Sequence, residues 1–380
     1  MFFLNPHVIH ALPTLQAESL SLGTGASTDT KDKTRMKAIV IHGEKDLRIE
    51  EREASGPGDG EIQVAIATGG VCGSDLHYYN HGGIGDHIRV REPLVLGHEV
   101  SGHVSAIGAG VTGFAEGDLV AVSPSRPCGD CRFCFEGSHN HCLNMRFYGS
   151  AMPMPHIQGA FRQTLNAKAV QCIKADGLTA GEAAMAEPLA VVLHATRNAG
   201  EMLGKRVLVT GCGPIGVLSI LAARRAGADE IVVTDLSDNA LEFARKAGAD
   251  LAINTMTQRD ALQVYSADKG YFDVMFECSG AVAALSAGIA AMRPCGVIMQ
   301  LGLSGDMSLP MMAITAKELQ LRGSFRFHAE FEMAVSLMSK GLIDVKSLVT
   351  HTLPLEKAEE AFLIANDRSR AMKAQIDFMT

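Results

Sequence analysis

A glycine-rich turn between an apolar strand and an apolar helix constrains this chain more than any other feature. Residues 206–210 are typical of a buried strand, and apolar residues recur at helical spacing over 217–226. Between them, a G-x-G-x-x-G turn permits a sharp bend, lets the backbone approach a pyrophosphate and allows helix and strand to pack closely. The pattern therefore predicts a Rossmann-type unit with a dinucleotide at the helix N-terminus. The residues expected to contact the cofactor are Gly211, Gly213, Pro214, Ile215 and Gly216.

A carboxylate at the end of the next predicted strand bears on the choice of cofactor. Asp235 follows the strand predicted at 230–234. A carboxylate there can accept hydrogen bonds from both ribose hydroxyls and repels a 2′-phosphate, so we predict NAD in preference to NADP. The alternative, a glycine turn followed by a surface aspartate, explains less of the pattern.

The alternation of strands and helices divides the chain into two regions. From residue 205, short apolar strands alternate with alanine-rich helices, which indicates an α/β region with a doubly wound parallel sheet. From Met36 to about residue 190, short strands are broken by glycine and proline, which indicates a mostly β domain. A strand candidate at 319–325 and amphipathic stretches at 330–340 and 355–366 follow, and by pattern alone they can complete either domain.

Composition and charge exclude several classes of protein. The net charge of −8 argues against a nucleic-acid or anionic membrane partner, and no apolar run approaches the ~18 residues of a membrane helix. No Lys or Arg precedes Lys31, so a secretory signal is not indicated and we expect a soluble cytoplasmic protein. We expect residues 1–35 to be a disordered leader, because their later part is rich in Ser, Thr, Gly and Asp.

Four of the nine cysteines fall within one short segment. The spacing Cys128-x2-Cys131-x2-Cys134-x7-Cys142 offers four thiolates, enough to close a tetrahedral shell around a structural zinc ion. A bacterial iron–sulfur run is the nearest alternative, but it has three residues before its last cysteine and a proline after it, whereas Leu143 follows here. We therefore predict zinc.

A second set of ligand-type residues is scattered along the chain. It comprises Cys72, His98, Glu99 and Glu187, and each is weak evidence when taken alone. Dehydrogenation by NAD needs a group that holds the alcohol oxygen, and a three-ligand zinc with an open position supplies one. A non-catalytic NAD-binding zinc protein would not need this set, and it is the alternative of a different class.

Several motifs in one order resemble the zinc-dependent medium-chain dehydrogenase/reductase family, and the resemblance covers essentially all of 36–380. They are Gly97-His98-Glu99, the four-cysteine segment, Ala186-Glu187-Pro188 and the glycine turn. The polyol branch, which includes the sorbitol dehydrogenases, is indicated by Cys72-Gly-Ser74-Asp-Leu-His77-Tyr78-Tyr79, by the acidic Glu187 and by Gly323-Ser-Phe-Arg326.

This resemblance implies a domain plan and two zinc ions per subunit. A GroES-like, mostly β catalytic domain takes 36–190 and 320–380, and the Rossmann domain takes 191–319. The catalytic zinc uses Cys72, His98 and either Glu99 or Glu187, and the choice between the two glutamates stays open. The resemblance also implies a small-molecule substrate and a homotetramer or dimer.

The same resemblance assigns residues to proton transfer and substrate binding. Ser74 and then His77 follow the ligand Cys72, so a hydroxyl and an imidazole can pass the substrate proton to solvent. Tyr78 and Arg326 match substrate-contacting positions of the polyol branch, whereas Phe327 replaces a tyrosine often found there.

The departure at Phe327 favours a substrate other than sorbitol. We expect a sugar acid, and a polyol such as sorbitol or xylitol is the alternative. An arginine is the best partner for a substrate carboxylate. We rank Arg146 first, before Arg126 and Arg326, because it lies in a stretch unlike the sorbitol dehydrogenases.

Overall fold

The computed structural model describes residues 35–380. The predicted leader therefore lies outside the described residues, except for Arg35, which begins strand β1 (Arg35–Gly43). Within 35–380, no helix is both long enough and apolar enough to cross a membrane.

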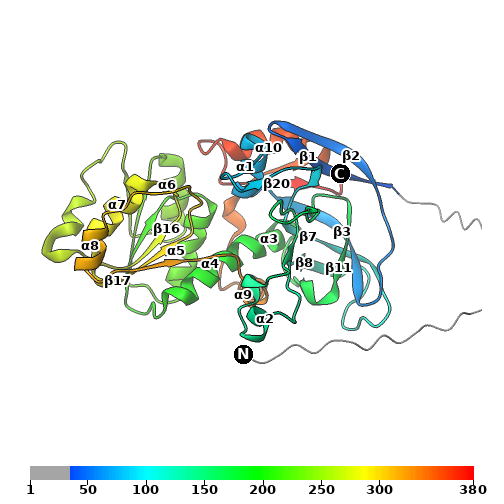
Figure 1. Ribbon diagram of the computed structural model, residues 1–380, viewed down its shortest axis with the longest axis horizontal. Helices are drawn as coiled ribbons and strands as arrows, with labels where there is room; N and C mark the ends of the chain where they lie inside the picture. Colours follow the sequence, from blue (N-terminus) through cyan, green and yellow to red (C-terminus); the bar gives the residue numbers. More distant parts are fainter. Residues whose placement is uncertain (1–34) are drawn as a thin grey trace, which may run out of the picture. The chain divides into compact units, whose positions relative to one another are not determined.

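The first sheet is built around strand β3 (Glu61–Gly70). Strand β7 (Glu99–Ile107) pairs antiparallel with β3, and the C-terminal strand β20 (Lys373–Asp377) pairs antiparallel with its last residues. Figure 1 shows this red C-terminal strand beside the blue strands β1 to β3. The end of the chain therefore completes the sheet that the beginning starts. The other strands of this seven-stranded sheet are β8 (Leu119–Val122), β11 (Thr164–Lys168), β12 (Cys172–Lys174) and β19 (Val349–Pro354).

The second large sheet has six parallel strands in the order β15-β14-β13-β16-β17-β18. This is the order of a dinucleotide-binding Rossmann sheet, with the switch point between the first and fourth strands along the chain. The strands are β13 (Arg206–Thr210), β14 (Glu230–Asp235), β15 (Leu251–Asn254), β16 (Phe272–Glu277), β17 (Met292–Gln300) and β18 (Gln320–Gly323). The helices that connect them are α5 (Pro214–Arg225), α6 (Asp238–Lys246), α7 (Val282–Ala291) and α8 (Met311–Ala316) (Figure 1). The predicted α/β class with a parallel sheet is confirmed.

Two predicted domain boundaries differ from the boundaries of the elements in the structure. Strand β18 pairs in parallel with β17, so the parallel sheet continues to Gly323 and not only to residue 319. Helix α4 (Ala186–Ala199) also runs through the boundary expected at 190 and 191. The apolar pattern of these segments could not show to which domain they belong. An edge strand or a helix has the same hydrophobic pattern whichever domain it packs against.

Shorter elements surround the two sheets. The three-stranded sheet β2-β1-β6 lies in the first region, and helices α9 and α4 pack together. These elements are β2 (Asp46–Glu53), β4 (Gly83–Ile84), β5 (Ile88–Arg89), β6 (Leu94–Val95), β9 (Ser125–Arg126), β10 (Arg146–Phe147), α1 (Gly73–His81), α2 (Arg132–Phe135), α3 (Ala180–Ala184), α9 (Glu330–Ser339) and α10 (Ala358–Asn366).

Candidate active site

A buried carboxylate fixes the turn that carries Cys72. Cys72 is the N-cap residue of α1, and its backbone N–H donates to Asp75 Oδ2 at 3.1 Å. Asp75 Oδ1 accepts from the Gly97 N–H at 3.3 Å and lies 3.8 Å from His98 Nδ1. Asp75 therefore holds together the turns that carry Cys72 and His98. The sequence analysis missed this role, although an acidic residue three positions after an N-cap is a known acceptor for the N-cap N–H.

Three of the predicted catalytic ligands come together. The ligand atoms of Cys72, His98 and Glu99 all lie within 4.8 Å of one another. Sulfur, imidazole nitrogen and carboxylate oxygen are donors that catalytic zinc takes, with a fourth position left open. Desolvation and the neighbouring Glu99 carboxylate raise the pKa of the Cys72 thiol to about 12, so the thiolate needs a cation beside it. This donor set fits a zinc ion.

Glu187 lies near this group but outside it. It occupies the first turn of α4 and is 5% exposed. Burial raises the pKa of Glu187 to about 8, and the charges of Glu99 and Cys72 act in the same direction. Of the two glutamates, the geometry therefore groups Glu99, and not Glu187, with Cys72 and His98.

Lys373 is a second residue of the site that the sequence analysis missed. It begins β20, its side chain is 3% exposed, and its ammonium forms an ion pair with Glu99. No local motif marks this lysine, because only the pairing of β20 with β3 brings it to the site.

The four clustered cysteines also come together as predicted. The ligand atoms of Cys128, Cys131, Cys134 and Cys142 lie within 4.8 Å of one another. Backbone N–H groups point at the sulfurs: Cys128 N–H donates to Cys142 Sγ at 3.1 Å, and Leu143 N–H donates to Cys131 Sγ at 3.5 Å. Hydrogen bonds from the Leu143 and Cys134 backbone lower the pKa of Cys131 to about 6. Such thiolate-stabilising donors fit a closed tetrahedral zinc site.

The glycine turn has the geometry expected for a dinucleotide. Gly213 is the N-cap of α5, Pro214 takes the first helical position, and Gly211 has a φ of +83°. A Cβ on Gly216 would collide with the Gly211 carbonyl, whereas one on Gly213 would meet open space. The third glycine is thus needed for packing, and the second faces a region that a ligand can approach.

Asp235 is the last residue of β14, and its carboxylate accepts hydrogen bonds from the backbone of this turn and of the next one. Its Oδ2 accepts from the Cys212 N–H at 2.6 Å, and its Oδ1 accepts from the Ser237 N–H at 2.8 Å. The carboxylate is therefore oriented at the carboxyl end of the sheet, where ligands of open α/β sheets bind.

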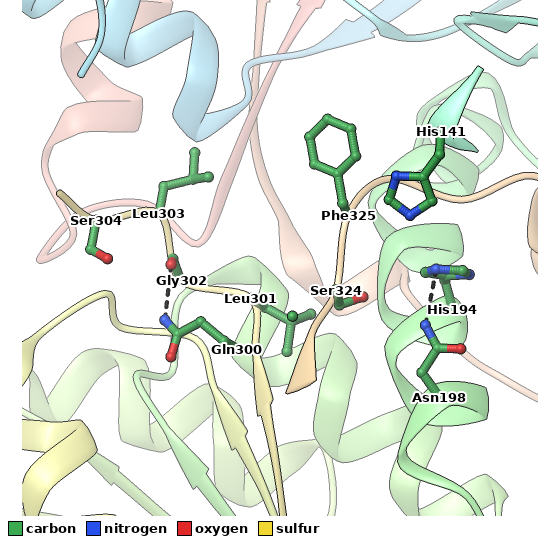
Figure 2. A pocket seen from close by; sticks show the side chains of 11 residues that line it. His141, His194, Asn198, Gln300, Leu301, Gly302, Leu303, Ser304, Ser324 and Phe325 are labelled. Atoms are coloured by element: carbon green, nitrogen blue, oxygen red, sulfur yellow. Dashed lines mark hydrogen bonds between the residues drawn. The ribbon is translucent and has the colours of Figure 1, made fainter. Parts of the chain in front are cut away.

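A cavity of about 390 Å³ opens beside the ends of β17 and β18. Figure 2 shows Gln300 and the loop to Ser304 on one side, Ser324 and Phe325 between, and His194 and Asn198 of α4 on the other. Within the described part of the chain, Gln300 Oε1 and Ser324 Oγ are buried polar atoms without a partner. These two oxygen atoms belong to residues that the sequence analysis missed, and they are available to polar groups of a ligand.

Arg326 lies over the Phe147 ring, and this ring lies 5.8 Å from that of His98. Its guanidinium carbon lies 4.1 Å from the centroid of the Phe147 ring. Burial lowers the pKa of Arg326 to about 10, while the nearby Tyr78 and Glu187 act in the opposite direction. Tyr78 is 4% exposed and its hydroxyl oxygen accepts from the Ala151 N–H at 3.2 Å. Arg326 is therefore a partly buried cation on which the charges of Tyr78 and Glu187 act.

The structure corrects the ranking of Arg146 as the first substrate arginine. Arg146 is exposed, whereas its neighbour Phe147 is buried under Arg326. Successive side chains of a strand point to opposite faces, so Arg146 faces away from the site. Arg126 lies opposite Arg146 in the pair of β9 and β10 and shares that outer face.

The argument from Phe327 also needs correction. This side chain is fully buried and its ring lies 5.7 Å from that of Phe331. It is a core residue here, so a phenylalanine at this position says nothing about which hydroxyls a substrate carries.

The predicted proton relay runs through two residues of helix α1. The Ser74 side chain lowers the pKa of the Cys72 thiol, although burial and Glu99 raise it more. His77 is half-buried, with its ring 5.9 Å from that of His81, and burial lowers its pKa. Transfer of a proton from Ser74 to His77 stays a prediction.

The fold and these two cysteine-containing clusters define a zinc-binding dehydrogenase. Residues 58–177 match the family model of the alcohol dehydrogenase GroES-like domain, and residues 214–340 match that of the zinc-binding dehydrogenases. The chain belongs to the zinc-dependent medium-chain dehydrogenase/reductase family and is an enzyme of its alcohol and polyol dehydrogenase class. Family membership implies zinc and a nicotinamide cofactor.

The chain is also similar to individual dehydrogenases over most of its length. The chain is 41% identical over 349 residues to L-idonate 5-dehydrogenase (NAD(P)(+)) of Escherichia coli strain K12, covering 90% of this chain and 99% of that protein. It is 40% identical over 330 residues to sorbitol dehydrogenase of Gallus gallus, covering 86% and 92%. The crystal structure of the Escherichia coli L-idonate 5-dehydrogenase superposes with a TM-score of 0.87 at 40% identity, over 91% of this chain and 99% of that one.

Proposed function

We propose that this enzyme oxidises L-idonate at C5 to 5-dehydro-D-gluconate and transfers the hydride to NAD. The observation that carries this proposal is Arg326, a partly buried cation over the Phe147 ring, which lies 5.8 Å from the ring of the proposed ligand His98. A guanidinium can bind a carboxylate through two parallel hydrogen bonds, and an aldonate has a carboxylate where a polyol has none. The similarity to an L-idonate 5-dehydrogenase supports the same substrate.

The catalytic metal site that we propose is formed by Cys72, His98 and Glu99, with Glu187 as the alternative carboxylate. Asp75 orients the first two of these ligands through the hydrogen bonds described above. The four cysteines from Cys128 to Cys142 form the proposed structural zinc site, which makes two zinc ions per subunit.

The residues of the chain then handle the proton and position the substrate. When bound, zinc would lower the pKa of a substrate hydroxyl toward neutrality, and the nicotinamide would accept the hydride from the same carbon. Arg326 and Tyr78 hold the substrate so that its C5 hydroxyl faces Cys72 and His98. Ser74 accepts the hydroxyl proton and His77 releases it to solvent, so the alcohol loses one hydride and one proton and becomes a ketone.

Initial rates of NADH formation test this proposal. The substrates are L-idonate, D-gluconate, sorbitol, xylitol and L-threonine, each with NAD and with NADP. A preference for L-idonate with NAD is the expected result. A preference for sorbitol or xylitol would make the enzyme a polyol dehydrogenase, and no turnover of any alcohol by the zinc-loaded protein would favour a non-catalytic role.

A further inference from the structure

A lysine lies deep within a group of acidic side chains. Lys373 is 3% exposed and forms an ion pair with Glu99, whose side chain is 1% exposed. Burial lowers the pKa of Lys373, but the charges of Glu99, Cys72 and Glu187 outweigh burial and raise it.

The backbone of β3 leaves space for this ion pair. A Cβ on Gly70 would collide with Glu99 Oε2 and would lie 2.9 Å from Lys373 Cε. Gly70 lies opposite Glu99 in one strand pair and opposite Gln375 in the other, so the pair is enclosed where three strands meet.

Stability alone is a poor explanation for this lysine. Removing two charges from water costs several kcal/mol per ion, and apolar residues of similar volume often serve a core at least as well. The neighbouring core positions of β20, Ala374 and Ile376, are apolar.

Charge balance gives the lysine a role at the metal site. A thiolate at Cys72 and carboxylates at Glu99 and Glu187 carry three negative charges, which a divalent cation alone does not neutralise. Lys373 supplies the third positive charge, and it lies in direct ion-pair contact with Glu99. Glu99 is therefore the donor whose charge is already partly compensated, which makes it the weakest of the three toward a cation.

We propose that Lys373 is a positioning residue that keeps Glu99 an exchangeable ligand, so that the substrate hydroxyl can replace the Glu99 carboxylate at the metal. This inference rests on the metal site proposed above. Without Lys373, Glu99 would bind the cation with its full charge and would resist replacement.

The test compares Lys373→Met with Lys373→Arg in the full-length protein. Affinity is measured by competition for Zn²⁺ with a chromophoric chelator, and Co²⁺ loading reports the donor set through its absorption spectrum. Loss of the positive charge in Lys373→Met is expected to tighten zinc binding at the site formed by Cys72, His98 and Glu99 by about tenfold or more. The same change is expected to lower kcat and to lower the melting temperature of the metal-free protein. Lys373→Arg keeps the charge, and its zinc affinity is expected to match wild type.

Two further variants separate positioning from simple packing. Gln375→Leu removes another buried polar group from β20 and is expected to lower the melting temperature without changing zinc affinity. In a Glu99→Gln background, Lys373→Met should no longer tighten zinc binding. If Lys373→Met does not fold, Lys373→Gln removes the charge while keeping a hydrogen-bond donor, with the same expected result.

The outcomes distinguish this inference from the proposed function. Zinc binding that is unchanged or weaker in Lys373→Met, in a protein that binds two ions, would overturn the role of Lys373 and leave the metal site standing. A wild-type chain that binds one ion, through its four clustered cysteines only, would overturn the proposed catalytic site and this inference together.

Discussion

Glu330 Oε1 lies 2.6 Å from Arg197 Nη1, and this ion pair joins helix α9 to helix α4. The same oxygen lies 3.3 Å from His194 Nδ1, and the other oxygen accepts from the His328 N–H at 3.1 Å. Burial alone would raise the pKa of Glu330, but the hydrogen bonds from His194 and His328 lower it to about 2.

This lowered pKa makes stability depend on pH in a defined range. A carboxyl whose pKa is lower in the folded state contributes stability above its unfolded pKa of 4.5 and loses it as the pH falls toward 2. Glu330→Gln should therefore lower the free energy of unfolding at pH 7 by about 2 kcal/mol, with a smaller difference at pH 3. Urea denaturation at both pH values measures this. The exposed Glu332→Gln is the matched control, and equal effects of the two variants would contradict the prediction.

Arg326 is expected to bind the substrate carboxylate. Arg326→Ala should raise KM for L-idonate by roughly tenfold or more, and should affect xylitol less, because a charged hydrogen-bonded pair is lost only with the acid. Steady-state kinetics with both substrates measures this difference. Arg146→Ala, on the outer face of β10, should leave both KM values unchanged. A larger effect of Arg146→Ala on L-idonate would restore the arginine that the sequence favoured.

His77 is expected to accept the proton from Ser74. Because its pKa is lowered, His77 stays neutral and able to accept a proton at mildly acidic pH. His77→Ala should reduce kcat by roughly tenfold near pH 6 and much less near pH 9, where hydroxide can replace the imidazole. The pH profile of kcat tests this, with the exposed His87→Ala as control. A profile of unchanged shape would remove His77 from the relay.

Asp235 is expected to select NAD over NADP. Asp235→Asn removes the charge that repels a 2′-phosphate, so the ratio of kcat/KM for NADP to that for NAD should rise at least about tenfold. The amide oxygen can still accept from the Cys212 N–H, but the amide nitrogen then replaces the oxygen that accepts from the Ser237 N–H, so the melting temperature of the variant is measured as well. The control variant is Asp229→Asn, which removes one negative charge from an exposed position and should leave this ratio unchanged. An unchanged ratio would show that other residues set the preference.

Features encoded in short segments could be predicted from the sequence. The glycine turn, the four-cysteine segment and most strands of the parallel sheet depend on local spacing, and the structure places them as expected. The sequence also identified Cys72, His98 and Glu99 as residues of types that bind zinc. It could not show that they lie close together, because this depends on the pairing of β3 with β7.

Features that depend on pairing between distant segments could not be predicted. Lys373 has no motif, since it reaches Glu99 only because β20 pairs with β3. The ranking of Arg146 before Arg326 rested on its stretch of sequence, and a two-residue strand gives too short an alternation to show that its side chain is exposed. The burial of Phe327 was also not predictable, since a buried and a substrate-facing aromatic look alike in sequence.

Helix α4 has a consequence for how this enzyme can be re-engineered or can recombine. Its first turn carries Glu187, while its later residues pack in one continuous core with Ile220 of α5 and Phe331 of α9. The Rossmann region is therefore not an interchangeable module. A graft of the nucleotide-binding half from a relative would have to carry the facing surfaces of α5 and α9 with it, or the carboxylate of Glu187 would shift.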